Sequence, residues 1–340
     1  MNRKYKIAAA CMALILLFSA FFFFYQKQQN ERQEPVSVTG FKLNTMIKIT
    51  VYDKVKPELL DKAMALCDKY EELFSRTLSD SEIYKLNHGT LPEKNGFFEV
   101  SPETAELVEK GLHYSELSNG AFDLSLAPVS SLWDFTSEEK VIPEAAALEA
   151  ALPLVDYKNI TLEGNAIHFE KEGMGLDLGA IAKGYIADKI KEFLVSEGVT
   201  SGIINLGGNV LCIGSQPDGT PFKIGIQKPF SDRGETAVTI EVSDKSVVSS
   251  GIYERYFKKD GVLYHHILNP KTGMPYENGL VSVTILSDKS VDGDALSTSC
   301  FALGAEKGME LVESLENTEA VFITEEGKFL YSSVFPADVQ

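Results

Sequence analysis

Basic side chains are scarce in this sequence of 340 residues, which has 32 lysines and arginines against 49 aspartates and glutamates and a formal net charge of −17. Proteins that bind nucleic acids or other polyanions neutralise phosphates with clustered Lys and Arg. The acidic balance therefore argues against such a surface. One phosphate or pyrophosphate group remains possible, because a helix N-terminus with one lysine or metal ion can hold it locally.

Cysteine is rare as well, with four residues that are widely spaced and form no C-x-x-C pair. The three that follow Cys11, namely Cys67, Cys212 and Cys300, cannot all pair within one chain, and each stands in an apolar pattern. We predict that they are small buried hydrophobic residues rather than zinc ligands or redox groups.

Several catalytic signatures are also missing. The sequence contains no P-loop, no dinucleotide-binding fingerprint, no H-E-x-x-H zinc motif, no G-x-S-x-G elbow and no internal repeat. What remains is an ordinary globular composition, with 44% hydrophobic and 24% charged residues. The length fits about two domains or one large domain.

The N-terminus holds one long hydrophobic run, from Ile7 to Tyr25, after three basic residues among the first six. At about 1.5 Å per residue this run is long enough to cross most of a bilayer core. The positive flank predicts a cytoplasmic N-terminus. A cleaved signal peptide is the alternative, but no small-x-small site precedes the polar segment. We predict a membrane anchor at 1–25, a polar tether at 26–39 and a folded domain at 40–340.

Residue periodicity predicts a mixture of strands and helices after the tether. Ile47, Ile49 and Val51 alternate with polar residues, and from residue 158 onward short alternating runs dominate. The elements expected with the clearest bounds are a strand at 45–52, helices at 59–73 and 101–120, a strand end at 176–178 leading into a helix at 180–196, and a helix at 294–315. Without regular βαβ alternation the pattern indicates an α+β fold.

Two segments combine glycines with charged groups at expected helix starts. Lys183 would lie in the first turn of a helix after Asp177-Leu-Gly-Ala180, where the backbone favours anions; a tight turn with a solvated lysine is the alternative. Asp294 and Thr298 are four residues apart and would share one helix face. Their oxygens suit Mg²⁺ bound together with phosphates. The alternative, favoured by pattern alone, is that Asp292 or Asp294 caps the helix.

Three further segments carry weaker signals. His265 and His266 precede a turn and could supply a base, a zinc ligand or a flavin contact, although no other histidine cluster supports zinc. Gly207-Gly208 is typical of a two-residue hairpin turn. In Gly120-Ala-Phe-Asp123, the phenylalanine fits a core position and the aspartate fits a turn.

Taken together, six segments resemble the ApbE family of FAD:protein FMN transferases. They are Gly120-Ala-Phe-Asp123, Asp177-Leu-Gly-Ala-Ile-Ala-Lys-Gly184, Asn205-Leu-Gly-Gly208, Ser249-Ser-Gly-x-Tyr253, His266-Ile-Leu-Asn-Pro-x-Thr-Gly273 and Asp294-Ala-Leu-Ser-Thr298. The resemblance implies a bacterial enzyme with an α+β, T-fold-like mixed sheet. It implies transfer of FMN from FAD to a threonine or serine hydroxyl of an acceptor flavoprotein, with release of AMP.

The resemblance also implies roles for particular residues. Mg²⁺ would be bound by Asp294, the Thr298 hydroxyl and the Ala180 carbonyl, and His266 and Asp294 are the candidate catalytic groups. The residues implied to hold FAD are Met46, Ala121, Phe122, Asp123, Asp177, Lys183 and Leu268. The expected partners are FAD, a membrane-bound redox subunit as acceptor and the membrane itself, with the folded domain on the extracytoplasmic face of the bacterial cell membrane.

The sequence departs from the family pattern in three places. Asn44-Thr45 replaces Gly-Thr, which bears on the Met46 contact; Asn269-Pro270 replaces Asp-Pro; and Ser297 replaces an alanine. Two other functions stay open at this point. An FAD pyrophosphatase would release FMN and AMP when water replaces the acceptor hydroxyl, and a non-catalytic extracytoplasmic carrier would only hold FAD.

Overall fold

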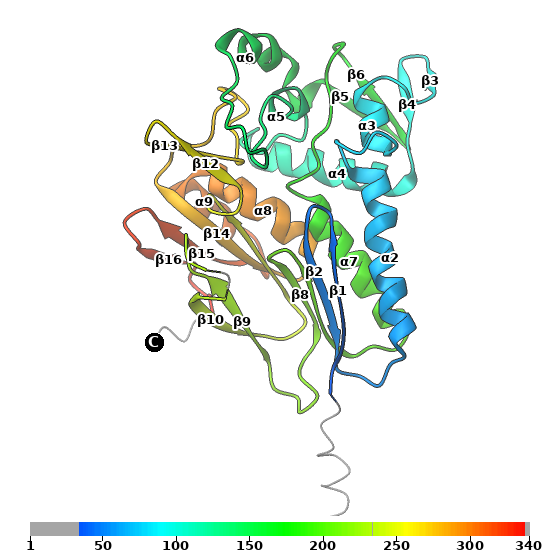
Figure 1. The fold of residues 1–340 in the computed structure, drawn as a ribbon, viewed down its shortest axis with the longest axis vertical. Coiled ribbons are helices and arrows are strands. Elements are labelled where there is room, and N and C mark those ends of the chain that lie inside the picture. The colour runs from blue at the N-terminus through cyan, green and yellow to red at the C-terminus, as the bar shows by residue number, and fades with distance from the viewer. Residues whose placement is uncertain (1–33, 233, 337–340) are drawn as a thin grey trace, which may run out of the picture.

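The computed structural model describes residues 34–232 and 234–336, and its centre is an eight-stranded sheet (Figure 1). In order across the sheet, the strands are β1 (Val36–Lys42), β2 (Thr45–Val51), β7 (Ser201–Leu206), β8 (Asn209–Gly214), β11 (Ser246–Gly251), β14 (Leu280–Ser287), β15 (Glu319–Thr324) and β16 (Phe329–Tyr331). All neighbouring strands are antiparallel. This arrangement agrees with the predicted α+β class.

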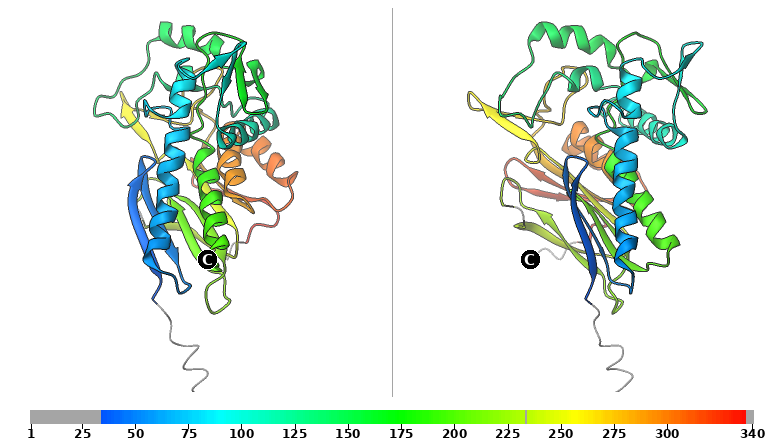
Figure 2. Two further views of the ribbon diagram at one scale, coloured as in Figure 1. Left: turned by 90° about the vertical axis from the view of Figure 1, so that its right-hand side faces the viewer. Right: turned by 45° about the vertical axis from the view of Figure 1, so that its right-hand side comes forward.

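Helices cover one face of this sheet (Figure 2). They are α2 (Pro57–Phe74), α7 (Ala182–Ser196), α8 (Ser290–Leu303) and α9 (Ala305–Glu313). In β2, Ile47, Ile49 and Val51 are fully buried while Lys48 is exposed, so the alternation in the sequence selects the face that meets the helices. Each such buried side chain contributes about 1.5–3 kcal/mol relative to exposure.

The opposite face is covered by a separate hairpin of β9 (Phe222–Gln227) and β10 (Thr236–Val242). Phe222, Ile224 and Ile226 alternate with exposed positions and pack with Val247 and Leu286 of the large sheet in a second core cluster. The sheet is therefore buried on both faces near its centre, where all eight residues of β14 are buried.

Smaller elements form the upper part of the molecule in Figure 1. One four-stranded sheet consists of β3 (Glu93–Lys94), β4 (Phe97–Glu99), β6 (Ala166–Phe169) and β5 (Ile160–Glu163). The helices here are α3 (Glu82–Asn87), α4 (Pro102–Leu117), α5 (Ala127–Ser130) and α6 (Ala145–Ala151), with the 3₁₀ turns Leu152–Leu154 and Tyr157–Asn159. A hairpin of β12 (Tyr256–Lys259) and β13 (Val262–His265) completes this part.

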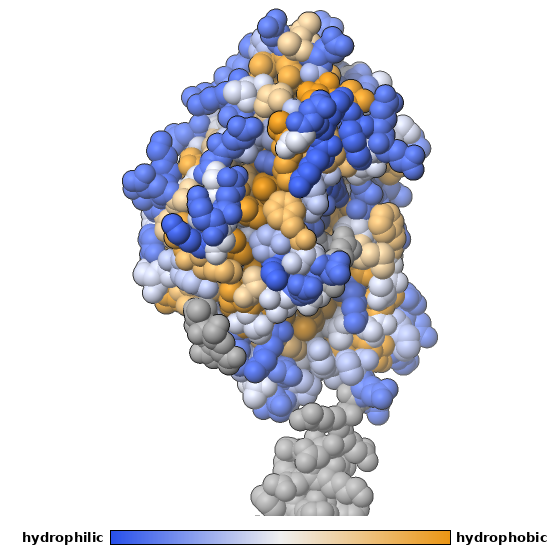
Figure 3. All heavy atoms as spheres, turned by 60° about the vertical axis from the view of Figure 1, so that its left-hand side comes forward, coloured by the Kyte–Doolittle hydropathy of each residue, from blue (hydrophilic) through white to orange (hydrophobic). Residues whose placement is uncertain are grey.

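Exposed apolar side chains are present on this mostly hydrophilic surface. Figure 3 shows one face on which hydrophobic side chains gather between hydrophilic ones. Exposed large hydrophobic residues include Phe230 and Tyr256, whose rings lie 5.6 Å apart in an edge-on arrangement.

Several predicted elements are confirmed with small shifts in their bounds. The strand at 45–51 and the helix α2 are present, and α4 begins after Ser101, whose hydroxyl accepts a hydrogen bond from the Thr104 amide at 3.2 Å. Asn119 and Gly120 both have positive φ after α4 ends, as a helix stop requires. Gly207 and Gly208 form the predicted hairpin turn, with φ of 66° and 100°.

Two predicted elements are wrong in their bounds or type. Residues 176–178 form no strand, because the Leu176 backbone bonds to the Asn87 side chain and the Asp177 amide donates to the Leu124 carbonyl at 2.8 Å. The helix predicted at 294–315 begins at Ser290 and is broken at Gly304, which has φ 82°. Asp292 and Asp294 therefore lie inside α8 and do not cap it.

The predicted domain boundary also shifts. Strand β1 begins at Val36, so the fold starts four residues before the expected limit at residue 40, inside the predicted tether. The predicted anchor, 1–25, and the tether up to residue 33 lie outside the described residues. Among the helices that the structure describes, none has the length and apolar character needed to span a bilayer.

The cysteine prediction is confirmed for the residues described. Cys67, Cys212 and Cys300 are free thiols, and all three are buried. Burial raises the pKa of each thiol to about 12. They therefore act as small core side chains.

Candidate active site

The most polar part of the candidate site lies where α7 begins against α8. The Gly184 amide donates a hydrogen bond to Oδ2 of Asp294 at 2.9 Å, and Nζ of Lys183 lies 3.9 Å from Oδ1 of the same carboxylate. A Cβ at position 184 would stand 2.2 Å from the Ser290 carbonyl oxygen. Only glycine allows the two helices to approach this closely, so helix packing explains why residue 184, after Lys183, is a glycine.

A group of hydroxyls lies one helical turn further along α8 from this contact. Gly184 lies in the first turn of α7, where the amides have no partner within the helix, and Asp294 of α8 accepts this one; Ala180 stands two residues before the start of α7. One turn along α8 from Asp294, Oγ1 of Thr298 lies 3.1 Å from Oγ of Ser250, which also bonds to Oγ of Ser297 at 2.7 Å. Ser250 belongs to the segment Ser249-Ser-Gly-x-Tyr253, but no role for it is predicted from the sequence.

This donor set fits magnesium better than a softer metal. Asp294 offers a carboxylate, Thr298 a hydroxyl and Ala180 a carbonyl, all hard oxygen donors. No group of three or more His, Cys, Asp or Glu side chains gathers for metal binding within residues 34–232 and 234–336. A cation held here would therefore take further oxygens from a bound phosphate, as Mg²⁺ commonly does.

Asp177 fixes the turn that leads into α7. Its Oδ2 forms an ion pair with Nε of Arg76 at 3.0 Å and accepts from Oγ of Ser130 at 2.6 Å, while Oδ1 accepts from the Gly179 amide at 2.9 Å. The sequence gave no sign of Arg76, because it stands about a hundred positions earlier, just after α2. In this structure Asp177 stabilises the turn by binding its backbone at Gly179 and by pairing with Arg76.

The loop after α4 is held by buried hydrogen bonds. Asp123 accepts from the amide and hydroxyl of Ser125 at 2.8 and 2.6 Å and from the Tyr157 amide at 3.0 Å; burial raises the pKa of its carboxyl group. The Phe122 side chain is only 4% exposed and belongs to the main core, as the pattern predicted. A ligand on this loop would meet its backbone or Ala121 rather than the Phe122 ring.

The two adjacent histidines have opposite hydrogen-bonding roles. His265 is buried, with Nε2 3.0 Å from the Tyr276 carbonyl and Nδ1 accepting from the Ile267 amide at 3.3 Å. Burial lowers the pKa of His265 to about 4. Because a carbonyl oxygen only accepts, the proton of its neutral ring is on Nε2.

His266 is half-buried and has the other tautomer. Its Nδ1 lies 3.3 Å from the Arg255 carbonyl, so Nδ1 carries the proton and Nε2 keeps a free lone pair. Burial, and then the nearby positive charges of Arg255 and Lys183, hold the pKa of this imidazole well below its usual range. The ring is thus neutral at pH 7 and able to accept a proton at Nε2.

Tyr276 links this histidine pair to the loop after α4. Its carbonyl contacts His265, and its hydroxyl donates to the Ala121 carbonyl at 3.0 Å. The structure thereby brings Ala121, Asp123 and the histidines to one region. Tyr276 is not predicted from the sequence, because its hydroxyl contacts Ala121, which is distant in the chain.

Two further residues that are predicted to bind FAD, Met46 and Leu268, differ in exposure. Met46 is 46% exposed near the start of β2, beside the Gly207-Gly208 turn, since a Cβ on Gly207 would meet the Thr45 side chain. Leu268 is buried in a cluster with Trp133 and Leu148. Roles for both in ligand binding stay predictions.

Comparison with known families and proteins gives one consistent result. Residues 43–322 match the model of the ApbE family. A protein of Klebsiella pneumoniae named FAD:protein FMN transferase is 35% identical over 85% of this chain and 88% of its own length. One of the same name from Treponema pallidum is 33% identical over 83% of this chain and 82% of its own.

Solved structures agree with this result. The ApbE protein of Thermotoga maritima superposes with a TM-score of 0.80 at 31% identity, over 88% of this chain and 97% of that one. The flavin transferase ApbE of Vibrio cholerae gives a TM-score of 0.79 at 29% identity, with the same coverage. The similarity spans nearly the whole described fold.

Proposed function

This chain belongs to the ApbE family, and from that premise we propose that it is an FAD:protein FMN transferase. The finer parts of the proposal are that the reaction requires Mg²⁺ and that the acceptor is a threonine or serine hydroxyl. The observation that carries it is the contact of Lys183 and Gly184 at the start of α7 with Asp294 of α8, beside the Thr298 hydroxyl.

Binding of the FAD pyrophosphate is the first task of these residues. Lys183 supplies one positive charge, and the first turn of α7 supplies the positive end of a helix dipole. Asp294, Thr298 and the Ala180 carbonyl would hold Mg²⁺. When bound, that ion neutralises negative charge that builds up on the phosphates during transfer. The net charge of −17 is compatible with this ligand because its charge is met locally.

The acceptor hydroxyl needs a base, and His266 is better placed than Asp294. Both oxygens of Asp294 already face donors, Gly184 and Lys183, whereas Nε2 of His266 has a free lone pair. A bound pyrophosphate would favour the imidazolium and raise the pKa of His266 toward the working range. We therefore assign the proton of the attacking hydroxyl to Nε2 of His266.

The transfer step exchanges one phosphorus–oxygen bond for another. The acceptor oxygen bonds to the phosphorus of the FMN half, the bond from that phosphorus to the bridging oxygen breaks, and AMP leaves with the bridging oxygen. Water in place of the hydroxyl would give FMN and AMP. Exclusion of water therefore separates a transferase from a pyrophosphatase.

One experiment separates transferase, pyrophosphatase and carrier. The full chain in detergent is incubated with FAD and Mg²⁺, with and without an acceptor flavoprotein, and AMP release and covalent flavin fluorescence of the acceptor are measured. We expect acceptor-dependent AMP and a fluorescent acceptor band, both lost in Asp294→Ala. AMP without labelling would indicate the hydrolase, and bound FAD without AMP would indicate the carrier.

We also propose that the folded domain lies outside the cytoplasm, anchored by the apolar run that follows the basic N-terminal residues. A membrane-bound redox subunit is then a suitable acceptor. Protease added to intact spheroplasts should degrade the domain if this is correct. Protection until the membrane is lysed would place the domain inside.

A further inference from the structure

Helices α7 and α8 cap each other through two aspartates. Asp294 of α8 accepts the Gly184 amide at the start of α7, at 2.9 Å. In return, Asp188 of α7 accepts the Ser290 and Val291 amides at the start of α8, at 2.8 and 2.9 Å. Asp188 lies one helical turn after Gly184 in α7, and Asp294 lies one helical turn after Ser290 in α8. The two helices are therefore fixed to each other in both directions.

No side chain from α8 itself replaces Asp188 as the cap. The residue before the helix, Lys289, makes no side-chain cap bond. The Ser290 hydroxyl donates elsewhere, to Oδ1 of Asn209 at 2.7 Å. A capping bond stabilises the start of a helix, and the negative charge of an aspartate at the positive end of the helix adds to this.

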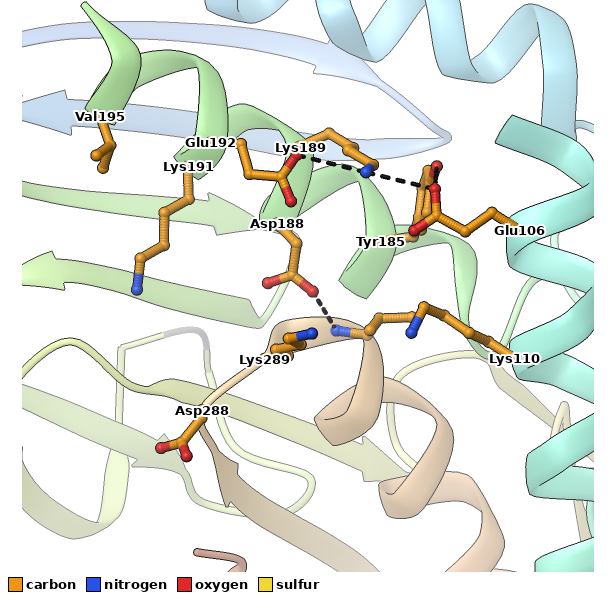
Figure 4. Close-up of a pocket in the computed structure, with 11 residues that line it drawn as sticks. Glu106, Lys110, Tyr185, Asp188, Lys189, Lys191, Glu192, Val195, Asp288 and Lys289 are labelled. Atoms are coloured by element: carbon orange, nitrogen blue, oxygen red, sulfur yellow. Dashed lines mark hydrogen bonds and ion pairs between the residues drawn. The ribbon is translucent and has the colours of Figure 1, made fainter. Parts of the chain in front are cut away.

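Asp188 lies in a cavity of about 270 Å³ between α4, α7 and the start of α8 (Figure 4). Lysines also line this cavity, and two of them form ion pairs with other acids: Lys189 with Glu106 and Glu192, and Lys191 with Asp244. The figure shows the Asp188 carboxylate directed at the α8 backbone. Its hydrogen bonds are thus used to hold a helix.

We propose that Asp188 is a positioning residue for the phosphate and metal end of the site. By capping α8 from α7 it sets how far α8 lies along α7, and it thereby places Asp294 and Thr298 against Lys183 and Ala180. The inference rests on the proposed function, because its readouts are metal and FAD binding. A shift of about 1 Å in such groups can cost about a hundredfold in rate.

The geometry explains why the effect reaches Asp294. One helical turn, about 5.4 Å, separates the Ser290 amide from Asp294, and a turn of helix moves as a unit. The contact at Gly184 leaves no space to absorb a shift, since its Cα faces the Ser290 backbone directly. Loss of the Asp188 cap would let the start of α8 move away from α7.

The test uses the full chain with Asp188→Asn, which keeps one acceptor oxygen, and Asp188→Ala, which keeps none. The matched control is Asp288→Asn, which removes a carboxylate from the same cavity that pairs with Lys245 at 3.3 Å rather than with the α8 backbone. Mn²⁺ affinity of the protein–FAD complex is measured by electron paramagnetic resonance. AMP release is measured against Mg²⁺ concentration, and folding by circular dichroism.

We expect Mn²⁺ affinity to fall about tenfold in Asp188→Asn and further in Asp188→Ala, with a matching rise in the Mg²⁺ concentration for half-maximal rate. Excess Mg²⁺ should restore part of kcat, and Asp288→Asn should match wild type. If Asp188→Ala does not fold, the inference is tested with Asp188→Asn.

A lower Tm with unchanged Mn²⁺ affinity would overturn the inference about Asp188 and leave the proposed function standing. A wild-type chain that binds FAD but neither binds Mn²⁺ nor releases AMP would overturn the proposed function as well.

Discussion

At the scale of single residues, neighbouring side chains of one type have different environments. Ser249 and Ser250 are adjacent in β11, so their hydroxyls point to opposite faces of the sheet. Ser249 bonds to Thr284 at 2.8 Å, and Ser250 bonds to Ser297 and Thr298 beside Asp294. The pair offers a matched test of the metal-binding end.

Ser250→Ala should weaken Mg²⁺ binding while Ser249→Ala should not. Each substitution removes hydrogen bonds worth about 1 kcal/mol, but only the first leaves the Thr298 hydroxyl without an orienting partner. We expect the Mg²⁺ concentration for half-maximal AMP release to rise about threefold to tenfold for Ser250→Ala. Equal effects of the two variants would contradict a role for Ser250 at this site.

Because the pKa of His265 is lowered, we expect this residue to reduce the free energy of unfolding in acid. Its folded pKa, about 4, is below the unfolded value near 6.5, so the unfolded chain binds more protons between these values and stability falls as pH drops through this window. One proton gives at most about 1.4 kcal/mol per pH unit. Urea unfolding at pH 7 and pH 5 should show a smaller difference for His265→Gln than for wild type. An equal difference would mean that His265 does not titrate this way.

At the scale of elements, the turn before α7 depends on a side chain from the end of α2. Arg76 pairs with Asp177 and also reaches Oγ of Ser131 at 3.3 Å, in a half-buried position. Lys69, on α2, pairs with Glu103 at 2.7 Å but is half exposed. An exposed pair contributes at most about 1 kcal/mol, whereas loss of a partly buried one leaves a carboxylate without its cation.

Arg76→Met should therefore cost about 1–3 kcal/mol of unfolding free energy and raise the KM for FAD, and Lys69→Met should cost less than about 1 kcal/mol and leave KM unchanged. Urea titrations and FAD-dependent AMP release measure the two quantities. An unchanged KM in Arg76→Met would show that the turn keeps its shape without the ion pair.

Elements with local signals could be predicted from the sequence, and elements held by distant residues could not. The helix α4 carries its own Ser-Pro start and Asn-Gly stop, so its bounds were close. Residues 176–178 have the composition of a strand, but Asn87 and Leu124 take their backbone bonds. The predicted start of α8 was wrong because its cap, Asp188, comes from another helix.

In the candidate site, the motif residues Lys183, Asp294 and Thr298 could be predicted from the sequence, whereas Arg76 and Asp188 could not.

At the scale of the whole molecule, the three described thiols report on global unfolding. Cys67, Cys212 and Cys300 are buried, and their raised pKa leaves almost no thiolate at neutral pH. In a Cys11→Ser chain, Ellman's reagent should react with none of them in the native state and with all three in urea. Fast labelling of one thiol without urea would reveal local opening in its part of the core.

The pairing of β2 with β7 has a consequence for the order of folding. Ile47 lies opposite Leu206, so the long stretch of chain between them must be made before this pair of strands can close. Until then β1 and β2 form at most a two-stranded hairpin, which is only marginally stable in water. Contacts this distant in sequence slow folding. While residues 52–200 are being made, a growing or translocating chain therefore presents the apolar face of β2, including Ile49, to its surroundings, and a holding chaperone that binds this strand would shorten its exposure.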